Sequence, residues 1–300
     1  MRPIARWLVP SLLMTAAACR GDLLAPAEPS VQFFSDFSGG GHLLYFLDHR
    51  DQLQEDRFVT EGLMEMDFSM LSFPRGLDLR LRFEMDANMG RSVAENLPFS
   101  PKETAYEINP FAEYRRDGLL CRAGLVHACQ HLIYKDDDSP WYLEEGVDIP
   151  PDVYWNRLYA GAGRPEIRPE ILRETYLGDS EGPKRPLVVW YAEAGWYLRS
   201  LGGLMDDESL YGDNDWAYDG KLDLMLPVCV TRRLALFASS RAHALFDTGD
   251  KAYWRERLEL ESFFASRGFG SSVFLAWNAV DEHPRDSREG LFELGARFFF

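Results

Sequence analysis

The chain has 300 residues, of which 46% are hydrophobic and 14% aromatic, and its formal net charge is -16 at pH 7. This apolar content excludes a mostly disordered chain and requires that a large apolar surface be covered. The excess of acidic over basic residues argues against a nucleic acid partner, because no basic surface would neutralise the phosphates.

The first 19 residues have the layout of a secretory signal peptide. Arg2 and Arg6 precede an apolar stretch that is too short to span a bilayer as a helix, and small residues follow up to Cys19. The stretch TAAAC also fits a lipoprotein signal, in which Cys19 would be lipidated after cleavage. Both interpretations predict export.

Apolar and charged residues alternate in many segments of the remaining chain. In residues 77–87, LDLRLRFEMDA, one face is apolar and the other charged. Residues 58–70 place Phe58 and several methionines opposite acidic residues, and SFPRG forms a tight turn between the two segments. Similar segments occur at residues 106–115, 188–199, 221–228, 233–246, 255–264 and 273–279. We count about 12 strands, most of about 10 to 14 residues, which is longer than is usual in soluble proteins.

The sequence predicts an all-β fold, a single antiparallel transmembrane β-barrel. After the signal peptide no apolar run reaches about 18 residues, so a membrane-spanning form of this chain must be a closed barrel. Tight connections such as RRDG and RGFG contrast with long acidic ones such as KDDDSPWYLEEGVDIPP, an asymmetry typical of outer-membrane barrels. The connection at residues 164–186 is long where a short turn is expected.

The polar faces distinguish this barrel from a soluble sandwich. They carry opposed Glu, Asp and Arg side chains and little Lys, and Arg is the residue of enclosed, bidentate ion pairs. We therefore expect a narrow lumen filled by charged residues, which disfavours an open porin.

The chain ends in ELGARFFF, in which one face alternates from Phe292 to Phe300. Glu293, Gly295, Phe298 and Phe300 resemble the C-terminal assembly signal of bacterial outer-membrane barrels: a polar residue, a glycine two positions on, and two alternate apolar residues. The resemblance implies the outer membrane of a Gram-negative-type envelope, contact with its lipids, and recognition of Phe300 by the barrel assembly machinery. The expected organisation is a signal peptide at residues 1–19, a periplasmic segment at 20–40 and the barrel at 41–300.

One strand, LLCRAGLVHACQHLIY, places His127, Cys129 and His131 on the face expected to meet lipid. Polar side chains there are costly and need a reason. We expect no metal site here, because residues four apart on a strand are about 13 Å apart, too far for His127 and His131 to share an ion. His127 and Cys129 could supply two ligands, but no other cluster completes a site. We expect no cofactor, although the acidic loops would suit a divalent cation such as calcium.

A nucleophile with its base is a second explanation, because residues two apart on one face can bring an imidazole to a thiol. The pair resembles the His-x-Ser pair of outer-membrane phospholipase A and of lipid A deacylases, barrels whose active residues face the acyl chains. The resemblance implies His127 as base, Cys129 in the serine position as nucleophile, and Asn156, from DVYWNRLYAGAG, as the residue that orients the base.

A closer overall resemblance is to a family of uncharacterised bacterial barrels that carry His-x-Ser-Ser-His-Leu before an acidic stretch. The segment HACQHLIYKDD keeps His127, His131 and Leu132, while Cys129 and Gln130 replace the serines. That family implies no activity.

Two functions follow. The first is a non-catalytic outer-membrane barrel with a structural or narrow transport role, in which the histidines are interfacial and Cys129 fills space. The alternative is an acyl-ester hydrolase acting on phospholipid or lipopolysaccharide. The sequence favours the first.

Overall fold

The computed structural model describes residues 31–49, 58–92, 97–116, 118–132, 152–164, 188–198, 216–230, 235–266, 269–283 and 287–299. In this part of the chain the secondary structure consists of antiparallel strands. Their bounds are β1 Gln32–Phe33, β2 Phe37–Leu47, β3 Thr60–Phe73, β4 Leu77–Ser92, β5 Leu97–Arg116, β6 Leu119–Leu132, β7 Asp152–Gly163, β8 Val189–Tyr197, β9 Trp216–Val230, β10 Ala235–Asp247, β11 Ala252–Ser266, β12 Phe269–Asp281 and β13 Phe292–Phe299.

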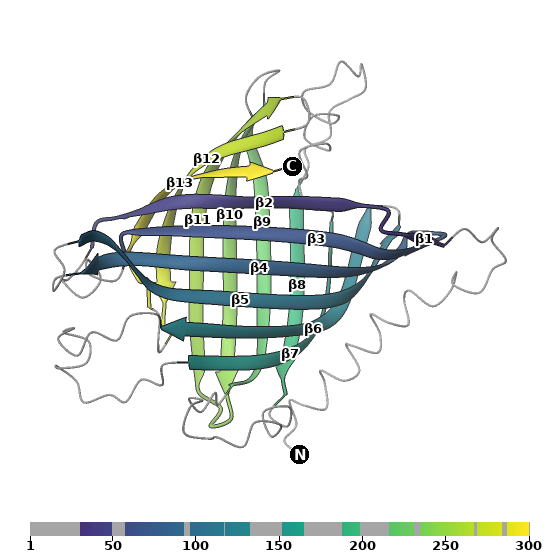
Figure 1. Cartoon of the computed structure of the whole chain (residues 1–300), viewed down its shortest axis with the longest axis horizontal. Coiled ribbons are helices and arrows are strands. Elements are labelled where there is room, and N and C mark those ends of the chain that lie inside the picture. Colours follow the sequence, from purple (N-terminus) through teal and green to yellow (C-terminus); the bar gives the residue numbers. More distant parts are fainter. Residues whose placement is uncertain are drawn as a thin grey trace.

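The strands β2 to β13 close into a barrel. Each pairs with its neighbours along the chain, and β13 pairs with β2 to complete the ring. The short β1 pairs with the end of β3 beyond β2. In Figure 1 the strands of the near wall run across those of the far wall, because all the strands are tilted relative to the barrel axis. Twelve barrel strands confirm the expected fold and number.

The barrel begins earlier than the expected residue 41, because β2 starts at Phe37. The signal peptide, Cys19 and most of the expected periplasmic segment lie outside the described residues. Among the described residues, no helix is long and apolar enough to cross a membrane.

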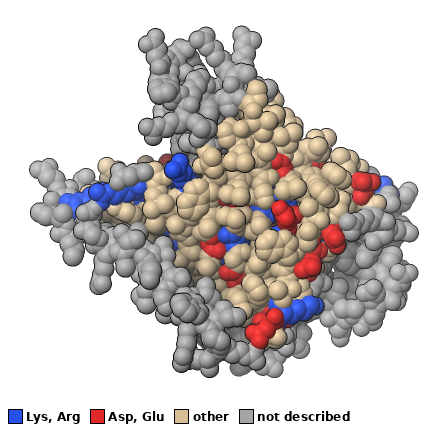
Figure 2. All heavy atoms as spheres, turned by 180° about the vertical axis from the view of Figure 1, so that it is seen from behind, with Lys and Arg blue, Asp and Glu red and all other residues tan. Residues whose placement is uncertain are grey.

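The outer wall is apolar. On β9 the side chains of Leu222, Leu224 and Leu226 are exposed, and large apolar side chains are exposed on every other barrel strand except β10. On the face that Figure 2 shows, uncharged side chains make up most of the described surface. A closed ladder with an apolar outer wall is the form in which β-strands cross a bilayer, since it leaves no edge unpaired.

Charged side chains alternate with these residues and point into the barrel, where they pair. The Arg157 guanidinium lies 2.6 Å from Glu193 and 2.8 Å from Asp219. Between β5 and β6, Glu113 is fully buried and accepts a hydrogen bond of 2.7 Å from Arg122. The interior is not filled evenly, because Lys221 and Arg241 are exposed there. The ion pairs agree with the expected lumen, which also has a more open part beside β9 and β10.

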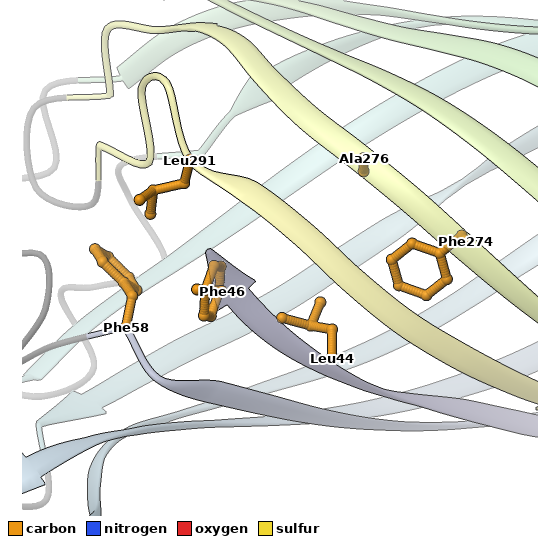
Figure 3. Packing of buried hydrophobic residues seen from close by; sticks show 6 residues of the cluster. All are labelled: Leu44, Phe46, Phe58, Phe274, Ala276 and Leu291. Carbon is orange, nitrogen blue, oxygen red and sulfur yellow. The ribbon is translucent and has the colours of Figure 1, made fainter. Parts of the chain in front are cut away.

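An apolar cluster also lies inside the barrel, at the end of β2, β3, β12 and β13 that Figure 3 shows. It comprises Leu44, Phe46, Phe58, Phe274, Ala276 and Leu291. Phe58 is 2% exposed and packs on Phe46, with ring centroids 5.3 Å apart. Its expected place on the lipid-facing side is therefore wrong: Phe58 precedes β3 and turns inward, where Phe46 offers aromatic contact.

The barrel has two distinct ends. The turn between β3 and β4, at residues 74–76, and that between β5 and β6 lie at the end where β13 finishes. Short turns mark the periplasmic end of outer-membrane barrels. The long connection expected at residues 164–186 also belongs to this end, and beyond residue 164 it lies outside the described residues. The opposite end carries the connection that follows β6.

Candidate functional site

Strands β6 and β7 bring two of the three expected site residues together. His127 on β6 and Asn156 on β7 are direct partners in the antiparallel ladder, and Ile108 on β5 is the partner of His127 on its other side. Directly opposed residues on one face have Cβ atoms about 5 Å apart. The register therefore places the imidazole next to the carboxamide.

This pair lies on the outer wall. His127 is exposed, and its neighbours Ile108 and Leu158 are 45% and 46% exposed. Asn156 is only 8% exposed, although it shares the face of Leu158. The imidazole therefore covers a polar side chain on a wall that presents mostly apolar side chains to lipid.

A hydrogen bond joins the two side chains. Nδ1 of His127 lies 2.9 Å from Oδ1 of Asn156. Because a carboxamide oxygen only accepts, Nδ1 carries the proton and donates it. In the neutral ring Nε2 then has the free lone pair, so this tautomer is the one in which Nε2 can accept a proton.

Cys129, the third expected residue, follows His127 by two positions on the same face and is half-buried. Its ladder partners are Tyr106 on β5 and Tyr154 on β7. Residues two apart on a strand are separated by about 6.6 Å, a distance that two side chains on one face can bridge. The thiol thus lies between two tyrosines and one step along the wall from the imidazole.

His131 lies one step further along the same face. Its ring is 6.0 Å from the ring of Tyr106, in an edge-to-face arrangement. The ring of Tyr106 is therefore directed toward His131 and away from His127. Sequence reasoning missed both tyrosines, because their alternation marks the face but only the register of three strands places them beside the thiol.

The site is nearer to the end of β6 from which residues 133–151 continue than to the tight turn before Leu119. By the rule for short turns, we expect that end to face outward from the cell. The acidic connection itself, where calcium was considered, lies outside the described residues. Within the described residues, no group of three or more His, Cys, Asp and Glu side chains could hold a metal ion.

Comparisons with known proteins found likeness only among solved structures. No protein-family model matches the chain, and no curated protein matches it. An outer-membrane phospholipase from Salmonella typhi, solved as a dimer with bound calcium, is 10% identical over 95% of this chain and 96% of that chain, with a TM-score of 0.44. Outer-membrane phospholipase A from Escherichia coli is 12% identical over 93% and 94% of the two chains, with a TM-score of 0.43.

An outer-membrane channel from Pseudomonas putida F1 is 11% identical over 93% of this chain and 97% of that chain, with a TM-score of 0.49. The activities of the phospholipases and of the channel are properties of those proteins. The closed twelve-stranded barrel described above, with its apolar outer wall and paired charges inside, is an outer-membrane β-barrel.

Proposed function

We propose that this outer-membrane barrel hydrolyses acyl esters of membrane lipids at its outer wall, with His127 as base, Cys129 as nucleophile and Asn156 as the residue that orients the base. One observation carries the proposal: the hydrogen bond from His127 Nδ1 to Asn156 Oδ1 on the lipid-facing wall. A lone interfacial histidine needs no such partner. A base does, because the bond fixes the tautomer in which Nε2 can take a proton.

The reaction follows from these positions. Nε2 of His127 takes the proton of the Cys129 thiol, and the thiolate sulfur attacks the ester carbonyl carbon. The carbon–oxygen bond to the lipid alcohol breaks, and the imidazolium returns its proton to that oxygen. Water then attacks the thioester, again with His127 as base, which releases the fatty acid and restores the thiol. Each cycle consumes one water and one ester.

The substrate follows from the place of the site. It lies on the wall that lipid covers, toward the end expected to face outward, so the ester must belong to a lipid of the outer leaflet. Phospholipid and lipopolysaccharide both carry acyl esters, and they are the two substrates to compare.

The test is the release of fatty acid from detergent-dispersed phospholipid and from lipopolysaccharide by the refolded barrel. We expect release by the parent, and a loss of about 10²- to 10⁴-fold in His127→Ala, the usual contribution of general-base catalysis. Cys121→Ser is the matched control, because Cys121 lies on the same face of β6 with Ala162 as its β7 partner. If neither the parent nor Cys129→Ser releases fatty acid, although heat-modifiable gel mobility shows that both are folded, the proposal is overturned.

A second function, structural support with narrow transport, is proposed for the interior. The exposed side chains of Lys221, Asp223 and Arg241 on β9 and β10 support it, since they leave part of the lumen open to solvent. Current through the barrel in a planar bilayer tests it. We expect small current steps that Arg241→Glu alters in ion preference, and an absence of steps would reject transport.

Assembly is the remaining proposal. We infer that the barrel assembly machinery recognises the C-terminal strand, of which Phe300 lies outside the described residues. In support, β13 is the strand that closes the ring, and on its outer face Leu294 is 50% exposed and Phe298 packs over Gly41 of β2. Deletion of Phe300 should lower the amount of heat-modifiable barrel in the membrane, and an unchanged amount would argue against this role.

A further inference from the structure

An ester hydrolase needs hydrogen-bond donors for the negative oxygen that forms when the nucleophile attacks. Backbone N–H groups commonly supply these donors, but the N–H groups around Cys129 are taken up by pairing within the sheet. Ala128, Cys129 and Gln130 are each paired with β5 on one side and β7 on the other. Every N–H of a central strand points to one of its two neighbours in the sheet plane. Donors for an oxygen above the outer wall must therefore be side chains.

Two such donors flank Cys129 directly in the ladder. Tyr106 and Tyr154 are the direct partners of Cys129 on β5 and β7, and both are half-buried on the outer wall. A phenol combines an apolar ring with an O–H donor, so it suits the boundary between hydrocarbon and headgroups. No other described strand places tyrosines on both sides of a cysteine.

The arrangement also separates the two tasks of the reaction. His127 lies on one side of Cys129 along β6, and from there it would serve the thiol and the leaving oxygen. The edge-to-face contact between Tyr106 and His131, 6.0 Å between centroids, lies on the other side. A carbonyl carbon above the sulfur would then have its leaving group toward the base and its oxygen toward the phenols.

We propose that the hydroxyl groups of Tyr106 and Tyr154 stabilise the oxyanion that forms when Cys129 attacks a lipid ester. This inference rests on the proposed function, and it names the two residues that would carry the charge stabilisation. The ring of His131 packs edge to face against the ring of Tyr106.

The first measurement is steady-state hydrolysis of a phospholipid ester by Tyr106→Phe, Tyr154→Phe and the double variant. Removal of one oxyanion donor lowers kcat by about 10²- to 10³-fold, so we expect a loss of this order for at least one single variant, a larger loss for the double variant, and an unchanged KM. Tyr114→Phe is the matched control, because Tyr114 is the β5 partner of Cys121 as Tyr106 is of Cys129. Its rate should equal that of the parent.

The second measurement does not depend on turnover. An alkyl trifluoromethyl ketone adds to a thiol to give a tetrahedral adduct with a negative oxygen, which fluorine NMR detects. We expect the adduct in the parent and in Tyr114→Phe, no adduct in Cys129→Ala, and a much weaker adduct in the Tyr106 and Tyr154 variants. The corresponding alkyl alcohol, which cannot form an adduct, should bind the parent and these variants equally.

The outcomes separate the two proposals. If the parent hydrolyses the ester and the double tyrosine variant matches its rate and its adduct, the oxyanion role is wrong and the hydrolase proposal stands. If the tyrosine variants lose hydrolysis but keep the adduct, the phenols act elsewhere and the oxyanion role is also wrong. If the parent neither hydrolyses the ester nor forms the adduct, the proposed function fails and this inference fails with it.

Discussion

The ring of Phe274 on β12 lies against Gly295 on β13 and occupies the space that a side chain at position 295 would need. The two residues are direct partners in the ladder, inside the barrel. The guanidinium carbon of Arg297 lies 4.0 Å from the centroid of the same ring. The glycine of the C-terminal pattern therefore has a packing reason in the folded barrel.

A larger residue at this position should destabilise the barrel. Gly295→Val would push a branched side chain into the Phe274 ring, and overpacking of this kind costs about 1 to 3 kcal/mol. Urea unfolding in lipid vesicles, followed by tryptophan fluorescence, measures the loss. Ala296→Val is the matched control, because Ala296 is exposed on the outer wall. Equal unfolding midpoints for both variants would contradict the packing argument.

Much of this fold could be predicted from alternation alone. The strict period of two in residues 77–87 gave the correct faces of β4, because lipid outside and ion pairs inside impose opposite polarity. The rule failed at Phe58, since the interior of this barrel also contains an apolar cluster. A period of two identifies the two faces, but it does not exclude an aromatic residue from the inner one.

For the candidate site, the sequence predicted which face of each strand carries the residues, but not which of their side chains contact one another. The sequence placed His127, Cys129 and Asn156 on lipid-facing positions, but the pairing of His127 with Asn156 depends on the register between β6 and β7. The connection at residues 133–151 is too long for its turn type to fix that register. The same limit explains why Tyr106 and Tyr154 were not expected beside Cys129.

Buried ion pairs on the inner wall should matter for stability. Glu259 is 5% exposed and accepts hydrogen bonds of 2.5 and 2.7 Å from Arg297, with Arg257 at 2.5 Å. Glu259→Gln removes the charge between two guanidinium groups, and breaking a buried pair costs about 3 to 5 kcal/mol. The urea midpoint should fall accordingly.

Glu256 on the same strand provides the control. It lies on the same face of β11 as Trp254 and Leu258, which are 42% and 37% exposed, so it is on the outer wall. Glu256→Gln should leave the midpoint unchanged or raise it, because a charge facing lipid is costly. A larger loss for Glu256→Gln than for Glu259→Gln would reverse the assignment of inner and outer faces on β11.

Asn88 should be a point where the barrel can be stabilised. It is 4% exposed, and neither atom of its amide has a hydrogen-bond partner within the described part of the chain. A buried amide left unsatisfied costs about 1 to 3 kcal/mol, so Asn88→Leu should raise the stability by up to this amount. The difference between the urea unfolding midpoints of Asn88→Leu and the parent measures this gain in stability.

Asn278 is the matched comparison for Asn88. It is 6% exposed, and its Nδ2 donates to Glu293 Oε1 at 2.8 Å. Asn278→Leu removes this bond and leaves a buried carboxylate with one donor fewer, so the barrel should become less stable. If both substitutions destabilise the barrel equally, the amide of Asn88 has hydrogen-bond partners when the barrel is in the membrane, and the prediction that Asn88→Leu stabilises it is wrong.

The last prediction concerns the orientation of the base. Asn156→Ala removes the acceptor for His127 Nδ1, so the imidazole can adopt the other tautomer and rotate away from Cys129. Hydrolysis should fall, within the about 10²- to 10⁴-fold that the base itself contributes, and KM should stay unchanged. Asn156→Asp keeps an oxygen acceptor and should retain more activity than Asn156→Ala.

Nitrogen-15 NMR of the imidazole measures which ring nitrogen carries the proton, and a loss of stability would not change this result. In the parent, the tautomer of His127 with the proton on Nδ1 should be the major one. In Asn156→Ala its population should fall. An unchanged tautomer in Asn156→Ala would mean that the hydrogen bond does not set the protonation of His127, and the observation that carries the hydrolase proposal would lose its force.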